Sequence, residues 1–183
     1  MRGNTKSVVV AAVMGMLVAL PADASAQART WKDVQVADIE TMGEKFVGLA
    51  RAFDEADYDW RPMEGVRSVR EVLALAVAEA HLFPGLWGGT PPAGAAQGFG
   101  PEMERVAPMS RTDMIAELES SFAFFASNVR GMSDQQRMAE GAFFGTAMPN
   151  HAVIASALGD MHEHLGQLIA YARANEVVPP WSS

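Results

Sequence analysis

The segment Asp160-Met-His-Glu-His164 places a carboxylate and an imidazole four residues apart. In an α-helix each residue turns about 100° from the one before, so Asp160 and His164 would share one face, about 40° and one turn apart. Carboxylates and imidazoles are both ligands for divalent metals. This pair therefore predicts a metal or small-ligand site. The alternative is a solvated Asp–His pair that only adds slightly to the stability of its helix.

The neighbouring polar residues fit this site unequally. His162 is about 200° from His164 on a helix, so the two imidazoles cannot bind one ion together. Gln167 lies about one turn beyond His164 and is predicted to orient its ring from behind. No pattern in the sequence identifies a catalytic group.

An earlier helical stretch carries two polar residues, Glu79 and His81. His81 is a candidate third ligand, although an imidazole in the last turn of a helix also suits the negative end of the helix dipole. Glu79 could face the interior, but a glutamate on a helix is expected to be exposed. His81 therefore joins Asp160 and His164 in the predicted metal set.

These residues must be positioned by four helices. Apolar residues recur at three- and four-residue steps in four stretches, from Ile39 to Phe53, Val72 to Leu82, Met114 to Val129 and Ile154 to Ala172. Such stripes are typical of helices that face a core. Ser68 and Glu71 form a capping box that begins the second helix, and Asn150 is the expected N-cap of the fourth. The pattern predicts an all-α fold, an up-down four-helix bundle.

The connecting segments carry little regular structure in this interpretation. Residues 88–101 are rich in Gly, Pro and Ala and are predicted to form an irregular loop. Residues 132–149 are predicted to be a connector with one short helical turn at 134–138. No stretch alternates between apolar and polar residues as a strand would.

Composition excludes several classes of function. The chain has 183 residues, a net charge of −8 and no cysteine. It therefore has no thiol nucleophile, thiolate ligand or disulfide. The acidic balance and the absence of a basic run after residue 6 argue against a nucleic-acid partner, because phosphate binding needs clustered Lys and Arg.

The first 26 residues have the features of a cleavable signal peptide. Arg2 and Lys6 precede an uncharged apolar run from Val8 to Leu20, and Ala24-Ser25-Ala26 supplies the small residues of a cleavage site. A bilayer span needs about 20 apolar residues, and this run is shorter. We therefore expect an exported protein, periplasmic or extracellular, without a stable membrane span. The alternative is an uncleaved membrane anchor.

Several short motifs in one order resemble the DinB-like (DinB/YfiT-like) family of four-helix bundles. They are Tyr58–Pro62, Gly65–Leu73, Glu163–Gln167 and Ala170–Arg173, followed by Val178–Pro180. The resemblance covers about residues 31–181, which we take as one domain. It implies the family fold and, since many members are candidate metal-dependent enzymes, a bound divalent metal such as zinc, nickel or iron.

The resemblance also implies a ligand pattern of three histidines, one in the second helix and two at i and i+4 in the fourth. His164 matches the second histidine of the pair. Asp160 stands where the first would be, and Leu75 stands where the helix-two histidine would be. Carboxylates bind such metals and leucine does not. The resemblance therefore leaves two alternatives, a chain that binds a metal and a chain that has lost the metal site.

Two functions follow. The first is an exported DinB-like domain with a degenerate divalent-metal or small-ligand site, in which a metal-bound water would support hydrolase- or transferase-like chemistry. The second is a non-catalytic bundle that binds a small apolar ligand or a partner protein through its Met- and Phe-rich interior and the 88–101 segment. The partners that the sequence allows are a small molecule and a second copy of the chain in a homodimer.

Overall fold

The structure is a computed structural model that describes residues 29–182. The predicted signal peptide, residues 1–26, lies outside these residues. No helix within the described range is both long and apolar enough to cross a membrane.

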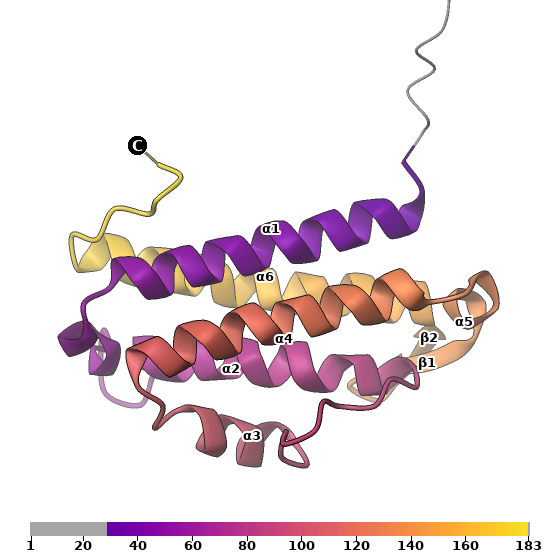
Figure 1. Cartoon of the computed structure of the whole chain (residues 1–183), viewed down its shortest axis with the longest axis horizontal. Helices are drawn as coiled ribbons and strands as arrows, with labels where there is room; N and C mark the ends of the chain where they lie inside the picture. The colour runs from indigo at the N-terminus through magenta and orange to yellow at the C-terminus, as the bar shows by residue number, and fades with distance from the viewer. Residues whose placement is uncertain (1–28, 183) are drawn as a thin grey trace, which may run out of the picture.

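Four long helices form the body of the molecule (Figure 1). They are α1 (Trp31–Ala52), α2 (Val69–Leu82), α4 (Arg111–Gly131) and α6 (Asn150–Ala174). The shorter elements are η1 (Glu55–Asp59), η2 (Phe83–Trp87), α3 (Phe99–Val106), α5 (Asp134–Met138), β1 (Glu140–Phe143) and β2 (Thr146–Pro149). The prediction was an all-α fold, and the structure is mostly helical with a short β-hairpin. The apolar stripes of the four long helices are buried, except for the half-buried Leu82.

Side-chain contacts give the direction of α1 relative to its neighbours. Arg51, near the end of α1, pairs with Glu119 in the first half of α4, so these helices are antiparallel. Trp31 and His151, in the first turns of α1 and α6, contact each other edge to face, so these helices are parallel. The first and last helices of the bundle therefore run in the same direction.

The direction of α2 follows in the same way. Tyr171, near the end of α6, donates a hydrogen bond to the carbonyl of Arg67 just before α2, so α2 and α6 are antiparallel. Arg70, at the start of α2, donates to the carbonyl of Met109 just before α4, so α2 and α4 are parallel. The order is up-down-down-up, and the predicted up-down order is wrong. The 83–110 connection is long enough to return along the bundle before α4 begins.

The helix starts follow the predicted capping chemistry closely. In the capping box, Ser68 Oγ accepts from Glu71 N–H at 3.3 Å and Glu71 Oε2 accepts from Ser68 N–H at 2.7 Å. Ser110 caps α4 through the N–H of Asp113. The fourth helix differs by one residue, because Pro149 rather than Asn150 is its N-cap.

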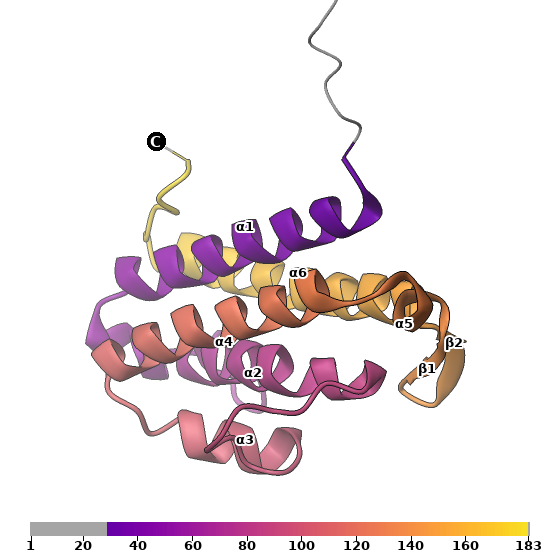
Figure 2. The same ribbon diagram turned by 45° about the vertical axis from the view of Figure 1, so that its right-hand side comes forward.

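Two of the connecting elements were not expected. Helix α3 begins at Phe99, inside the segment predicted to be irregular, and lies along the outside of the bundle (Figures 1 and 2). Strands β1 and β2 form a hairpin at one end of the bundle. Its two-residue turn, Phe144-Gly145, has positive φ at both positions, as the favoured hairpin turn requires. A phenylalanine at such a position is uncommon, so the turn lacks the residue pattern by which hairpins are predicted from sequence.

Helix α2 is the most enclosed element. It contacts α3, α4, α6, η1 and η2, and every residue from Val72 to His81 is buried. Glu79 and His81 therefore face protein on opposite sides of α2, since they are two residues apart. These two polar residues define the two polar clusters of the bundle.

Candidate functional site

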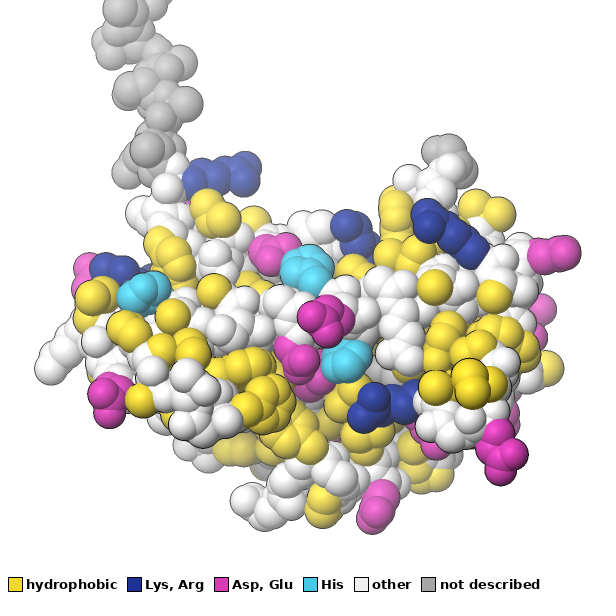
Figure 3. Space-filling model, turned by 180° about the vertical axis from the view of Figure 1, so that it is seen from behind, with side chains coloured by type: hydrophobic (Ala, Val, Ile, Leu, Met, Phe, Trp, Pro, Cys, Tyr) yellow, Lys and Arg dark blue, Asp and Glu magenta, His cyan; other side chains and the backbone are white. Residues whose placement is uncertain are grey.

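Glu79 of α2 meets Asp160 and His164 of α6. His164 Nε2 lies 3.1 Å from Glu79 Oε1 and 4.0 Å from Asp160 Oδ2. One ligand atom from each residue lies within 4.8 Å of the other two. Figure 3 shows imidazole and carboxylate side chains gathered near the middle of the face seen from behind. The structure thus brings the predicted Asp160–His164 pair together with a third metal-ligating side chain.

The cluster opens gradually from the interior to the solvent. The side chain of Glu79 is 3% exposed, that of His164 18% and that of Asp160 27%. Asp160 and His164 lie on one face of α6, as their spacing predicted, and both point toward α2. A small ligand can therefore approach from the Asp160 side while Glu79 anchors the site from within.

The pKa values of Glu79 and His164 are both raised, by burial for Glu79 and by pairing for His164. Removal from water raises the pKa of Glu79. The hydrogen bond with Glu79 raises the pKa of His164, and the charge of Asp160 acts in the same direction. His164 Nε2–H therefore donates to Glu79 Oε1, and the pair holds a proton that a bound metal ion would displace.

One oxygen of the cluster lacks a partner. Glu79 Oε2 is buried and accepts no hydrogen bond from any described residue. A buried carboxylate oxygen without a donor is costly, and a bound cation is one way to satisfy it. The donor set of two carboxylates and one imidazole is also compatible with zinc or iron. The residues present therefore fit a divalent metal.

Glu79 was not among the predicted ligands. It lies four residues after Leu75, hence on the same face of α2 and one turn further along. The signal that could have found it is the composition of α2, whose residues from Val72 to Leu82 are apolar except Glu79 and His81. A helix that is apolar on all sides is buried, and so are its few polar residues.

Gln167 lies on the same face of α6 as His164, but it makes a different contact. Its amide donates to Tyr171 Oη at 2.7 Å, and Tyr171 donates to the carbonyl of Arg67 at 3.0 Å. This chain of hydrogen bonds ties α6 to the loop before α2. His162 points elsewhere and pairs with Asp38 of α1 at 3.0 Å.

His81 does not join the Asp160–His164 cluster, because it projects from the opposite side of α2. Its Nδ1 lies 2.8 Å from Glu102 Oε1, and its ring packs edge to face against Phe124. The structure therefore corrects the predicted grouping: Glu79, not His81, is the α2 residue beside Asp160 and His164.

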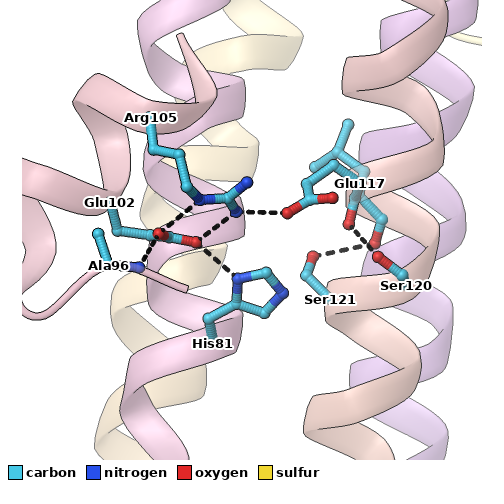
Figure 4. A network of polar contacts seen from close by, with 8 residues as sticks. His81, Ala96, Glu102, Arg105, Glu117, Ser120 and Ser121 are labelled. Atoms are coloured by element: carbon cyan, nitrogen blue, oxygen red, sulfur yellow. Dashed lines mark hydrogen bonds and ion pairs between the residues drawn. The ribbon is translucent and has the colours of Figure 1, made fainter. Parts of the chain in front are cut away.

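The second cluster, His81 with Glu102 and Glu117, is organised around an arginine (Figure 4). Arg105 Nη2 lies 2.7 Å from Glu102 Oε1 and also pairs with Glu117. The guanidinium thus stands between the two carboxylates, where a metal ion would otherwise be held. We read this cluster as the attachment of α3 to α2 and α4.

Glu102 is ionised despite its burial. Removal from water would raise its pKa, but hydrogen bonds from Arg105, from the N–H of Ala96 and from His81 outweigh that effect and lower the pKa to about 2. A cavity of about 210 Å³ lies beside His81 and Arg105, under residues 92–95 of the loop.

Comparison with known proteins agrees with the described fold. The family model of the DinB superfamily matches residues 38–168. Similar solved structures include a DinB-like protein from Bacillus cereus (14% identity, TM-score 0.65, covering 80% of this chain and 93% of that chain). Another is a DinB-like protein from Bacillus subtilis (17% identity, TM-score 0.62, covering 82% and 97%).

A mycothiol-dependent maleylpyruvate isomerase is also similar in structure (14% identity, TM-score 0.62). The match covers 76% of this chain and 63% of the isomerase, so the chain spans less than two thirds of that enzyme. At such identities the likeness concerns the fold alone. The search of curated proteins gives no significant match.

Proposed function

The chain belongs to the DinB superfamily, and from this premise we propose that it is an exported metalloprotein whose divalent cation binds Glu79, Asp160 and His164. The observation that carries the proposal is the buried Glu79 Oε2, which has no hydrogen-bond donor among the described residues. It belongs to a side chain whose other oxygen lies 3.1 Å from His164 Nε2.

The roles of the three side chains follow from their positions. Glu79 supplies the interior negative charge, His164 supplies a ring nitrogen once its proton leaves, and the more exposed Asp160 closes the set from α6. When bound, a zinc, nickel or iron ion in such a site would activate a water molecule or polarise a substrate oxygen. Hydrolase- or transferase-like chemistry on a small substrate is the activity that this arrangement supports best.

Metal analysis of the purified full chain tests this proposal. We expect about one divalent metal ion per chain by elemental mass spectrometry. Glu79→Gln, Asp160→Asn and His164→Gln should each lose metal, since each removes one ligand atom without changing side-chain size greatly. Glu163→Gln is the matched control, because Glu163 is exposed on the same helix beside His164. It should retain metal.

The alternative, a non-catalytic bundle, predicts a different result. The protein would be purified without metal, and its melting temperature would be the same with and without a chelator. Circular dichroism of each variant separates loss of ligand from loss of fold. A folded wild-type chain that takes up no zinc, nickel or iron would overturn the metal proposal.

A further inference from the structure

An arginine without a carboxylate partner among residues 29–182 lies near the open side of the proposed metal site. Arg67 is exposed in the loop just before α2. The main chain of Arg67 lies beside Tyr171, which is two turns after His164 on the same face of α6. Figure 3 shows a basic side chain beside the imidazole and carboxylate groups of this face.

The backbone of Arg67 is held in place by contacts from both sides. Its carbonyl accepts the 3.0 Å hydrogen bond from Tyr171 Oη, on the face of α6 that also carries His164 and Gln167. The ring of Tyr171 packs edge to face against Trp60, at the start of the same loop. The main chain that carries Arg67 is thus fixed relative to α6, which reduces the ordering cost of binding a ligand.

The charge of Arg67 is not used within the described part of the chain. Its neighbours Arg61 and Arg70 pair with Glu71 and Asp59, whereas Arg67 has no carboxylate partner among residues 29–182. An unpaired guanidinium is well suited to bind a carboxylate or phosphate through two parallel hydrogen bonds. In a chain of net charge −8, such a group beside a site of acidic ligands marks where an anion can be accepted.

We propose that Arg67 binds the oxyanion group of a small ligand, a carboxylate or a phosphate, whose other end reaches the cation held by Glu79, Asp160 and His164. This inference rests on the proposed function, because the cation supplies the second point of attachment. Arg67 is a positioning residue in this scheme. It selects anionic ligands over neutral ones of the same size.

Calorimetric titration of the zinc-loaded full chain with inorganic phosphate and, separately, with succinate tests the inference. We expect binding of at least one of the two, and the better ligand identifies the preferred oxyanion. Arg67→Gln should weaken that binding about tenfold, the loss of one charge-assisted interaction. Arg67→Lys should lose less, since it keeps the charge but not the planar fork.

The matched control is Arg173→Gln. Arg173 is an exposed residue of α6 that also lacks a carboxylate partner within residues 29–182, and its replacement should leave anion binding unchanged. Metal content is measured on every sample. If metal is bound but Arg67→Gln binds the anions as tightly as wild type, or wild type binds neither, the inference fails and the metal site stands. If wild type holds no metal, the proposed function fails first.

Discussion

At the scale of single residues, the site depends on one buried carboxylate. Glu79 is 2% exposed and has one oxygen toward His164 and one without a donor among the described residues. A carboxyl group buried in that position is stable only if it is protonated, paired with a cationic side chain or bound to a metal. The same side chain therefore links the stability of the metal-free protein to the binding of a cation.

The metal-free protein should show this link as a dependence of stability on pH. The pKa values of Glu79 and His164 are raised in the folded state, so their contribution is complete below the unfolded values and is lost as pH rises through the folded ones. For His164 the loss should begin above about 6.5. The free energy of unfolding, measured by urea denaturation, should fall more between pH 6 and 8.5 for wild type than for His164→Gln.

Metal loading should reverse that trend. The cation replaces the shared proton, so its affinity and the stability that it adds should rise with pH over the same range. Parallel pH profiles for wild type and His164→Gln, both measured after chelation, would show that the pair makes no pH-dependent contribution to stability.

At the scale of elements, a buried charge attaches α3 to the bundle beside the apolar packing of Phe99 and Val106. Glu102 of α3 is fully buried and is bound by His81 of α2 and by Arg105. Arg105 in turn pairs with Glu117 of α4. Side chains of three helices thus meet in one cluster around Glu102 and Arg105, which fixes the long connection between α2 and α4 to the bundle.

Replacing this carboxylate should release α3. Glu102→Gln leaves Arg105 with only its pairing to Glu117, and loss of a buried ion pair costs about 3 kcal/mol. Amide hydrogen exchange should accelerate in residues 99–106 before the four long helices are affected. Glu104→Gln is the control, because Glu104 is exposed on the same helix. Equal exchange in both variants would contradict this role.

Acid should have the same effect on the wild-type protein. The pKa of Glu102 is lowered to about 2 from an ordinary value of 4.5. Its contribution is therefore present above pH 4.5 and is lost as pH falls from 4.5 toward 2. Exchange in α3 should accelerate over that interval in wild type and change less in Glu102→Gln.

At the scale of the whole molecule, the return path of the 83–110 connection decides which helices are neighbours. Because α2 and α4 are parallel, the connection runs back along the bundle, and α2 becomes enclosed on most sides. That enclosure buries both Glu79 and His81 and creates two polar clusters on opposite sides of one helix. A simple up-down order would not need such a connection.

Export is the remaining proposal at this scale. When the full gene is expressed in a bacterium with a periplasm, we expect the protein in the periplasmic fraction or the medium. Cleavage after Ala26 would leave 157 of the 183 residues, which intact-mass measurement can detect. A full-length mass with the protein in the cytoplasm would contradict the export proposal, without bearing on the metal site.

The local features were predictable from the sequence because they depend on neighbours along the chain. Helical periodicity placed the four apolar stripes, and the Ser68–Glu71 box fixed the start of α2. The same periodicity put Asp160 and His164 on one face of α6. Each of these follows from the geometry of a single helix, which is the same in any fold.

Only the tertiary structure decided which residues of different helices meet. The rotation of α2 about its axis and its parallel course with α4 brought Glu79 to His164 and carried His81 to Glu102. Those choices depend on the route of a connection of 28 residues between α2 and α4 and on the packing of α2 against five other elements. Periodicity within one helix carries no information about either, because it describes a face and not its neighbour.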